Sequence, residues 1–426
     1  MNLKEIIIEL LEEYEKGKYS NIILNEFFRK NKLQSKEKGF ITEIFYGVIR
    51  NLIFLDYQMA KRTKKVKKSY LKQLLRISFY QIAFMESDNK SVVWEAVELS
   101  KKYGDMSNFI NGVLRKYLLE YEKDIETLEK SDWGVRYSYP EWFIKKLKSQ
   151  YGKRTLELMK SFKEIPYLSV RINKFKMSEE EFLNFIESKN IKIVNRVEDI
   201  FYLSKSIIDT KEFEEGKIIV QDGSSYLAAK LLGAKENEKI LDTCSAPGSK
   251  SLVIAEEMNN KGIVFSLDIF EHKLKLIKEN AEKMGVEIIN PILQDARKID
   301  ELNDDFDRIL VDAPCSGFGV IRKKPEAIYK RNMDNILELA NLQMEILSSA
   351  SKKLKVGGYL VYSTCTIFEE ENTKNIEKFL EENKDFEVEE INLPSNIESI
   401  KDNLGGFTIL DKYLDGFYII KLKKKS

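Results

Sequence analysis

The chain has 426 residues, of which 43% are hydrophobic and 33% are charged, and its net charge is +1. This composition excludes a disordered chain, and the length predicts two or three domains. No apolar run approaches the roughly 20 residues that span a membrane, and the start lacks a basic stretch followed by an uninterrupted apolar one. We therefore expect a cytoplasmic protein with no membrane partner.

Residues 1–130 have apolar side chains at helical spacing and almost no proline, which predicts an all-helical bundle. Residues 1–120 contain 22 Lys and Arg against 15 Asp and Glu, although the whole chain is nearly neutral. Six of these cations lie in residues 61–68, Lys-Arg-Thr-Lys-Lys-Val-Lys-Lys. This run is either a solvated loop or a surface that neutralises RNA phosphates, and we favour RNA contact.

Residues 131–215 are predicted to form a linker and a small α/β module. Short apolar runs such as Leu168 to Asn173 alternate with helical patterns, and the acidic stretch from Ser178 to Lys189 begins with the Ser-x-x-Glu pattern of a capping box.

From residue 216 to residue 426 the pattern becomes strand, helix, strand, helix. The apolar strand candidates are residues 239–242, 262–268, 308–312, 358–362 and 417–422. Repeated alternation of this kind predicts a mostly parallel, doubly wound, Rossmann-like sheet.

A turn of small residues follows the first of these strands. It consists of Cys244, Ser245, Ala246, Pro247, Gly248, Ser249 and Lys250. Such a turn is either an ordinary tight connection or a place where the backbone approaches a nucleotide-like ligand. The second strand ends in Asp268, and an acid there can accept both hydroxyls of a ribose. Because GxxxxGK(S/T) and GxGxxG are both absent, ATP and dinucleotides are disfavoured.

Two of the three cysteines lie where an apolar strand runs into a loop. Cys315 follows Asp312-Ala313-Pro314, and Cys365 follows Ser363-Thr364. An isolated cysteine is usually a small buried hydrophobe, but two thiols at matching strand ends suggest covalent chemistry on an electrophilic carbon. With no CxxC pair and a single histidine, the sequence predicts reduced thiols and no metal site.

These motifs together resemble the RsmB-type branch of the RNA 5-methylcytosine methyltransferases, over nearly the whole chain. Residues 46–50, 74–81 and 108–115 resemble the NusB-like RNA-binding domain. The resemblance implies a NusB-like domain in residues 1–130, an RNA-positioning module in residues 131–215, and an S-adenosylmethionine-dependent methyltransferase domain in residues 216–426. The implied partners of this expected monomer are small-subunit ribosomal RNA and ribosomal assembly intermediates.

The resemblance also implies roles for individual residues. Cys365 is the nucleophile that adds to C6 of a cytosine in 16S ribosomal RNA, and Cys315 promotes loss of the C5 proton and release of product. Asp312 contacts the N3 or N4 edge of the base and lies near the cofactor. Residues 244–250, Asp268 and Asp295 bind S-adenosylmethionine, although Asp295 taken alone is more typical of a helix N-cap.

Further residues after Cys315, namely Arg322-Lys323-Lys324-Pro325-Glu326 and Lys330-Arg331, are expected to hold phosphates around an extruded base. The chain departs from the family pattern at Ser249, where a second glycine is usual, and in residues 408–414, which lack a histidine that relatives commonly have.

Three alternatives stay open. The first is 5-methylcytosine formation in large-subunit ribosomal RNA or transfer RNA. The second is a DNA cytosine methyltransferase with Cys315 as nucleophile, which the Thr364-Cys365 element disfavours. The third is a non-catalytic RNA-binding ribosome-assembly factor, which predicts degraded catalytic positions, whereas Asp268, Asp312 and both strand-end cysteines are present.

Overall fold

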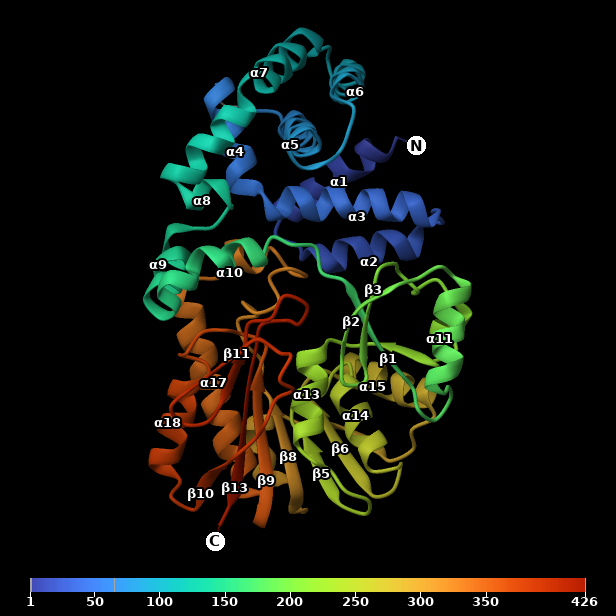
Figure 1. Cartoon of the computed structure of the whole chain (residues 1–426), viewed down its shortest axis with the longest axis vertical. Helices are drawn as coiled ribbons and strands as arrows, with labels where there is room; N and C mark the ends of the chain where they lie inside the picture. The colour runs from blue at the N-terminus through green and yellow to red at the C-terminus, as the bar shows by residue number, and fades with distance from the viewer. Residues whose placement is uncertain (1, 65, 426) are drawn as a thin grey trace. The chain divides into compact units, whose positions relative to one another are not determined.

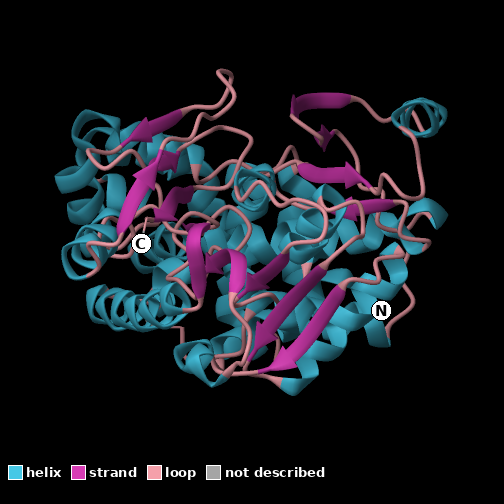
Figure 2. Cartoon of the chain, turned by 90° about the horizontal axis from the view of Figure 1, so that it is seen from below, coloured by secondary structure: helices cyan, strands magenta, loops and turns pink. Residues whose placement is uncertain are grey.

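The computed structural model of the protein describes residues 2–64 and 66–425. Its internal contacts divide the chain into two units, Met1–Glu164 with Lys323–Lys330, and Ile165–Arg322 with Arg331–Ser426. Within the described residues, the first strand begins at Leu168, so all strands (magenta in Figure 2) belong to the second unit. No helix in those same ranges is long and apolar enough to cross a membrane. The predicted domain boundaries near residues 130 and 215 stay predictions.

The first unit is built from helices, which Figure 1 draws in blue to green for the residues up to Glu164. They are α1 (Leu3–Glu15), α2 (Ser20–Lys30), α3 (Ser35–Arg50), α4 (Leu52–Arg62), α5 (Ser69–Phe84), α6 (Asn89–Lys101), α7 (Ser107–Ser131), α8 (Trp133–Arg136), α9 (Glu141–Tyr151), η1 (Gly152–Arg154), α10 (Thr155–Ser161) and α16 (Ala327–Lys330). The structure confirms the predicted helical bundle.

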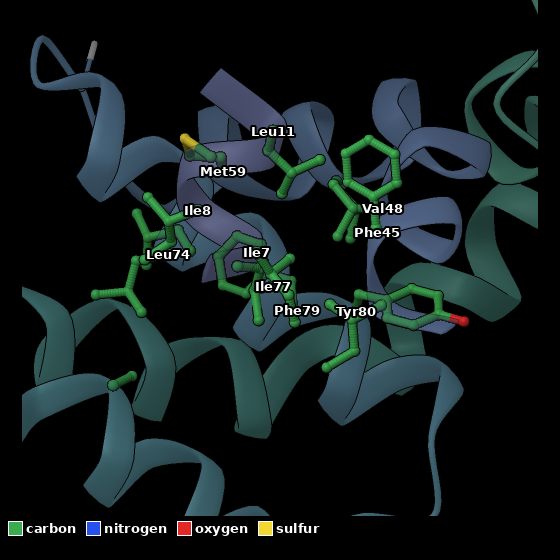
Figure 3. Close-up of a cluster of buried hydrophobic side chains, with 14 of the residues drawn as sticks. Ile7, Ile8, Leu11, Phe45, Val48, Met59, Leu74, Ile77, Phe79 and Tyr80 are labelled. Atoms are coloured by element: carbon green, nitrogen blue, oxygen red, sulfur yellow. The ribbon is translucent and has the colours of Figure 1, made fainter. Parts of the chain in front are cut away.

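Helical spacing of apolar residues explains the core of this bundle. On α5, Leu71, Leu74 and Leu75 are buried as the spacing predicted, and they join one cluster with the inner faces of α1, α3 and α4. Figure 3 shows Ile7 of α1, Phe45 of α3 and neighbouring residues of this cluster directed toward one another.

The second unit begins with a small antiparallel sheet in the order β2-β3-β1-β4. Its elements are β1 (Leu168–Ile172), α11 (Glu179–Ser188), β2 (Ile193–Val197), β3 (Ile200–Leu203), α12 (Lys211–Glu214) and β4 (Ile218–Val220). The capping box predicted at the start of α11 is present, since the side chain of Ser178 accepts from the backbone of Glu181 and the Glu181 carboxylate accepts from the backbone of Ser178. The apolar face of α11 packs on β1 and β3.

The rest of the second unit forms a nine-stranded sheet with helices on both faces (green to red in Figure 1). Its elements are α13 (Gly223–Leu231), β5 (Lys239–Asp242), α14 (Ser249–Glu257), β6 (Ile263–Asp268), α15 (Glu271–Met284), β7 (Ile289–Leu293), η2 (Ala296–Glu301), β8 (Phe306–Asp312), α17 (Met333–Lys352), β9 (Leu354–Thr364), α18 (Thr373–Glu382), β10 (Phe386–Glu389), β11 (Ser399–Lys401), β12 (Phe407–Ile409) and β13 (Phe417–Lys424). The sheet order is β11-β12-β13-β9-β8-β5-β6-β7, with β10 against β13.

Successive residues of the central strands face two different cores. Ile240 and Leu310 pack with α13 and α14 on one side, whereas Leu241, Ile309 and Val311 pack with α17 and α18 on the other. Because side chains alternate along a strand, near-continuous apolar runs are required when both faces are covered. The predicted doubly wound, Rossmann-like sheet is confirmed.

The order of the strands indicates where a ligand would bind to this sheet. Strands β9, β8, β5, β6 and β7 are mutually parallel. The chain passes from β5 through β6 to β7 in one direction and then returns to β8 on the other side of β5. Strand order therefore reverses between β5 and β8, and ligands bind beyond the carboxyl ends of strands at such a point.

Candidate active site

The carboxyl ends of β5, β8 and β9 bring the predicted site residues together. β5 ends at Asp242, β8 at Asp312 and β9 at Thr364, one residue before Cys365. Lys250, in the first turn of α14, reaches across this edge, and its Nζ donates to Asp312 Oδ2 at 2.6 Å. The loop after β5 and the two strand-end cysteines therefore belong to one site.

The turn after β5 is shaped by its own backbone. The hydroxyl of Ser245 donates to the carbonyl of Asp242 at 2.7 Å, and the amide of Ser245 donates to the carbonyl of Leu267 at 2.9 Å. Ala246-Pro247 is a cis peptide, and Gly248 has φ +99° immediately before α14 begins. Because Gly248 stands in the left-handed region, glycine is favoured at that position. Ser249, at the position where the family pattern predicts a second glycine, is the first residue of α14.

Asp242 has an oxygen atom available beside this turn. Its Oδ2 accepts from Ser251 at 2.6 Å, while its Oδ1 is buried and, within residues 2–64 and 66–425, has no hydrogen-bond partner. Burial raises the pKa of Asp242 to about 6. A buried acceptor without a donor is costly unless a ligand supplies one, so the donors of a nucleoside or amino-acid moiety fit this position.

Asp268 and Asp295 differ in the hydrogen bonds and ion pairs that their carboxylates make within the protein. Asp268 ends β6 and is nearly buried, and it accepts from the amide of Phe270 at 3.0 Å and from Lys273 at 3.4 Å. Asp295 caps η2 through the amide of Arg297 and pairs with the guanidinium of that residue at 2.6 Å. Asp295 thus shows the N-cap geometry that its sequence position also allowed.

The two strand-end thiols face each other. Cys315 Sγ and Cys365 Sγ lie 2.8 Å apart, and both cysteines are free. The hydrogen bond with Cys365 and burial raise the pKa of the Cys315 thiol well above its ordinary value. Cys244 is not part of this pair, and burial raises the pKa of its thiol to about 12. One of the facing thiols is therefore a neutral donor when the other is a thiolate.

Lys250 supplies the positive charge of the site. Burial lowers its pKa, but the carboxylate of Asp312 more than offsets this, so the pKa of Lys250 is raised overall. The ammonium also interacts electrostatically with Cys365. A cation near a cysteine favours its thiolate. The hydroxyl of Ser363 donates to the other oxygen of Asp312 at 2.8 Å, which fixes the orientation of that carboxylate.

Backbone contacts join the loop after Cys315 to the segment around Cys365. The amide of Gly319 donates to the carbonyl of Cys365 at 3.0 Å, and the amide of Gly416 donates to the carbonyl of Gly319 at 2.9 Å. A Cβ at Gly319 would lie 1.7 Å from the Gly416 carbonyl oxygen, so only glycine fits there. The Asp-Gly-aromatic element at residues 415–417 thus packs against the Cys315 loop.

The expected phosphate contact of the segment after Cys315 is wrong for Arg322, and it stays a prediction for the other cations of that segment. Arg322 is buried and donates to the backbone carbonyls of Asp411, at 2.6 Å, and Lys412. In the first unit, Lys330 donates to the carbonyl of Gly17 at 2.7 Å, and the buried Glu326 accepts from Ser20 at 2.6 Å. Carbonyl oxygens satisfied these donors, which a sequence pattern cannot reveal. Lys324 stays exposed.

The basic run at residues 61–68 also contains both cations that are paired within the protein and cations that stay exposed. Lys61 and Arg62 pair with Asp124, the second at 2.6 Å, and the side chain of Arg62 is fully buried. Lys64, Lys67 and Lys68 are exposed and line a pocket with the apolar Val66, Leu71, Met106 and Phe109. Lys65 lies outside the described residues.

One group near the thiols was missed by sequence reasoning. Glu371 is fully buried, and its carboxylate accepts from the amide of Ser316 at 2.8 Å and from Gln343 at 2.9 Å. The only available signal was the acidic run Glu369-Glu370-Glu371 soon after Cys365, which is typical of a solvated helix start.

Comparisons with known proteins cover the whole chain. Residues 229–423 match the family described as 16S rRNA methyltransferase RsmB/F, residues 1–118 match the NusB family, and residues 139–207 match the RsmF/B-like ferredoxin-like domain. The chain is 38% identical to the "Probable ribosomal RNA small subunit methyltransferase B" of Bacillus subtilis, over 100% of this chain and 99% of that one. It is 31% identical to the "Ribosomal RNA small subunit methyltransferase B" of Escherichia coli K12, with the same coverage.

Two solved structures are also similar to this chain. The crystal structure of PH0851 has a TM-score of 0.80 at 29% identity and covers 100% of this chain and 99% of its own. A methyltransferase homolog protein from Pyrococcus horikoshii has a TM-score of 0.60 at 28% identity and covers 71% of this chain and 99% of its own.

Proposed function

Because the chain belongs to the RsmB/F family of ribosomal RNA methyltransferases, which use S-adenosylmethionine, we propose that it methylates C5 of a cytosine in small-subunit (16S) ribosomal RNA. In this proposal the reaction proceeds through a covalent bond between Cys365 and C6 of the base. A cytosine C5 is a poor nucleophile until a group adds at C6, and a thiolate both adds and leaves readily.

The arrangement of the two thiols with Lys250 is the observation that supports this most directly. The Lys250 ammonium interacts electrostatically with Cys365, while Cys315 lies 2.8 Å from Cys365, sulfur to sulfur, and is the thiol whose pKa is strongly raised. This arrangement supports Cys365, rather than the thiol of raised pKa, as the attacking nucleophile. It disfavours the DNA-methyltransferase alternative, in which Cys315 would attack.

Two cysteines carry the steps of the proposed reaction. The Cys365 thiolate forms a bond to C6, and the electron pair of the C5=C6 bond becomes available at C5 for the methyl group. S-adenosylmethionine supplies that methyl group as an electrophilic carbon on its sulfonium. Once Cys365 is bonded to C6, Cys315 no longer faces a thiolate and can give its own proton to solvent. The Cys315 sulfur then accepts the C5 proton, the electron pair of that C–H bond restores C5=C6, and Cys365 leaves as a thiolate.

In the proposed reaction, Asp312 accepts a hydrogen bond from the edge of the cytosine base. Each of its oxygens already accepts one hydrogen bond, from Lys250 and from Ser363, and each has a second lone pair. The free lone pairs suit the N4 amino group of cytosine, a donor. Preorganised groups of this kind stabilise charge that develops in a transition state.

The covalent route is tested with RNA that carries 5-fluorocytosine at the target position. Fluorine cannot leave C5 as a proton, so elimination is blocked and the protein stays bonded to C6. Wild-type protein with S-adenosylmethionine should give an RNA adduct that survives denaturing electrophoresis. The absence of that band, with methylation of ordinary RNA intact, would contradict the covalent route.

We expect Asp268→Asn to weaken S-adenosylmethionine binding. Its carboxylate is proposed to accept the ribose hydroxyls, and hydrogen bonds to charged groups are worth about 1.5–3 kcal/mol each, so Kd should rise more than about tenfold. Calorimetric titration of the cofactor measures this. Glu271→Gln, an exposed carboxylate in the first turn of α15, is the matched control and should bind as wild type. Equal affinity of Asp268→Asn and wild type would contradict the assignment.

The exposed lysines 64, 67 and 68 are proposed to contact RNA phosphates. Each neutralised phosphate adds about 0.7–0.9 to the slope of log K against log salt. The triple variant Lys64→Ala/Lys67→Ala/Lys68→Ala should therefore bind 16S RNA more weakly, with a slope shallower by about 2.

Filter binding at several salt concentrations measures this slope. The triple variant Lys32→Ala/Lys36→Ala/Lys153→Ala removes equal charge from other exposed positions of the same unit and serves as control. A slope equal to that of wild type in the first variant would exclude these lysines from the RNA contact.

A further inference from the structure

The two peptide groups that flank Cys315 are both held by side chains from elsewhere in the second unit. Before the cysteine, the carbonyl of Pro314 accepts from Gln343 Nε2 at 2.9 Å. After it, the amide of Ser316 donates to Glu371 Oε1 at 2.8 Å. The segment itself belongs to no helix or strand between Asp312 and Lys323. Side chains therefore support Cys315 on both sides, in addition to the backbone hydrogen bonds from Ala313 to Ser363 and from Gly319 to Cys365.

Four buried polar residues form this support, which we name the Glu371 cluster: Ser316, Gln343, Thr366 and Glu371. Gln343 Nε2 also donates to Glu371 Oε1 at 2.9 Å, and the hydroxyl of Ser316 donates to Glu371 Oε2. The hydroxyls of Ser316 and Thr366 lie 2.9 Å apart. Ser316 follows Cys315 and Thr366 follows Cys365, so the cluster joins the residue after one thiol to the residue after the other.

Glu371 is held in turn by the sheet and by α17. The hydroxyl of Tyr362, on β9, donates to the carbonyl of Glu371 at 2.6 Å, and its oxygen lies 3.1 Å from Gln343 Oε1. Asn375, on α18, also donates to Gln343 Oε1 at 3.1 Å. A buried network whose members are all satisfied is rigid and specifies a single arrangement.

A carboxylate suits the centre of this cluster. Three donors converge on its two oxygens, and an ionised carboxylate is the side chain that offers acceptors only. An amide in its place would direct an NH₂ group toward one of the donors. Replacing the Glu371 carboxylate with an amide removes its charge and one acceptor but keeps its shape. The replacement therefore loosens the Cys315 loop without leaving a cavity.

We propose that Glu371 is a positioning residue for methyl transfer, which acts by holding the Cys315 loop so that the second thiol stays beside Cys365 for the release step. The inference rests on the proposed covalent route. Groups that take part in catalysis must be placed within about 0.5 Å, and a displacement of about 1 Å costs about 10²-fold in rate. The release step, which depends on Cys315, should suffer more than the addition step. Cys365 directly follows β9 and keeps the support of that strand, whereas both peptide groups beside Cys315 are held by the Glu371 cluster.

The test is the variant Glu371→Gln. It should lower kcat about 10²-fold, while KM for RNA and for S-adenosylmethionine stays within about twofold. It should also accumulate the denaturant-resistant RNA adduct on ordinary cytosine RNA, as Cys315→Ala does. A merely structural role would lower the amount of active protein but would not shift the reaction toward the adduct.

The matched control is Glu369→Gln, two residues earlier, whose half-exposed carboxylate pairs with Lys374 at 2.8 Å on the surface. It should behave as wild type in both readouts. Ser316→Ala, which removes one donor to Glu371 and the link to Thr366, should accumulate adduct to a smaller extent. It keeps the inference testable if circular dichroism shows that Glu371→Gln does not fold.

The outcomes separate the two proposals. If Cys315→Ala accumulates adduct but folded Glu371→Gln does not, the positioning role is overturned and the covalent route stands. If Glu371→Gln is unfolded and Ser316→Ala shows no adduct, the positioning role is likewise overturned. If Cys315→Ala accumulates none, the covalent route fails and the inference falls with it.

Discussion

Replacing Cys365 with alanine is expected to abolish methyl transfer, with a loss of at least about 10³-fold in kcat. The variant lacks the only group proposed to bond to C6, so C5 is never activated. No RNA adduct should form, with ordinary or with 5-fluorocytosine RNA. Transfer of label from S-adenosylmethionine to 16S RNA and denaturing electrophoresis measure the two losses.

Binding serves as the control for Cys365→Ala. The cofactor turn and Asp268 are untouched, so the Kd for S-adenosylmethionine should equal that of wild type. If the variant keeps adduct formation, Cys365 is not the nucleophile and the roles of the two cysteines are reversed.

Cys315→Ala is expected to stop turnover but to leave addition possible. Cys365 keeps Lys250 nearby and can still bond to C6, whereas the step that restores C5=C6 loses its thiol. The protein should therefore accumulate as an RNA adduct that resists denaturant, visible as a band of reduced mobility. Turnover should fall by about 10²-fold or more.

The double variant Cys315→Ala/Cys365→Ala distinguishes a specific adduct from nonspecific retention of RNA. It should show no shifted band. A band of equal intensity in the double and single variants would mean that the retained RNA is not bonded to Cys365.

Much of the fold could be predicted from the sequence because the central strands are buried on both faces. Strands β5 and β8 appear as continuous apolar runs between turn residues, and the structure places them where expected. β7 was not predicted, because it is an edge strand that contains Pro291 and exposes Leu293. β10 was missed although Phe386-Glu387-Val388-Glu389 alternates with the period of a strand.

Of the candidate site, only the residues that lie at strand ends could be predicted from the sequence. Cys315, Cys365 and Asp312 follow or end apolar strands, so the sequence alone predicted that they lie at one edge of the sheet. The pairing of Lys250 with Asp312 spans 62 residues, and that of Glu371 with Ser316 spans 55. No local pattern marks contacts at such separations. Arg322 lies in a basic run that is typical of a phosphate site, yet the backbone carbonyls of Asp411 and Lys412 accept its hydrogen bonds.

Identification of the methylated nucleoside tests the central proposal most directly. The purified full chain is incubated with labelled S-adenosylmethionine and, in parallel, with 16S RNA, large-subunit RNA, transfer RNA and DNA, and each polymer is digested to nucleosides for mass spectrometry. We expect 5-methylcytidine from 16S RNA alone. Label in another nucleoside, in another polymer, or in none although the cofactor binds, would contradict it.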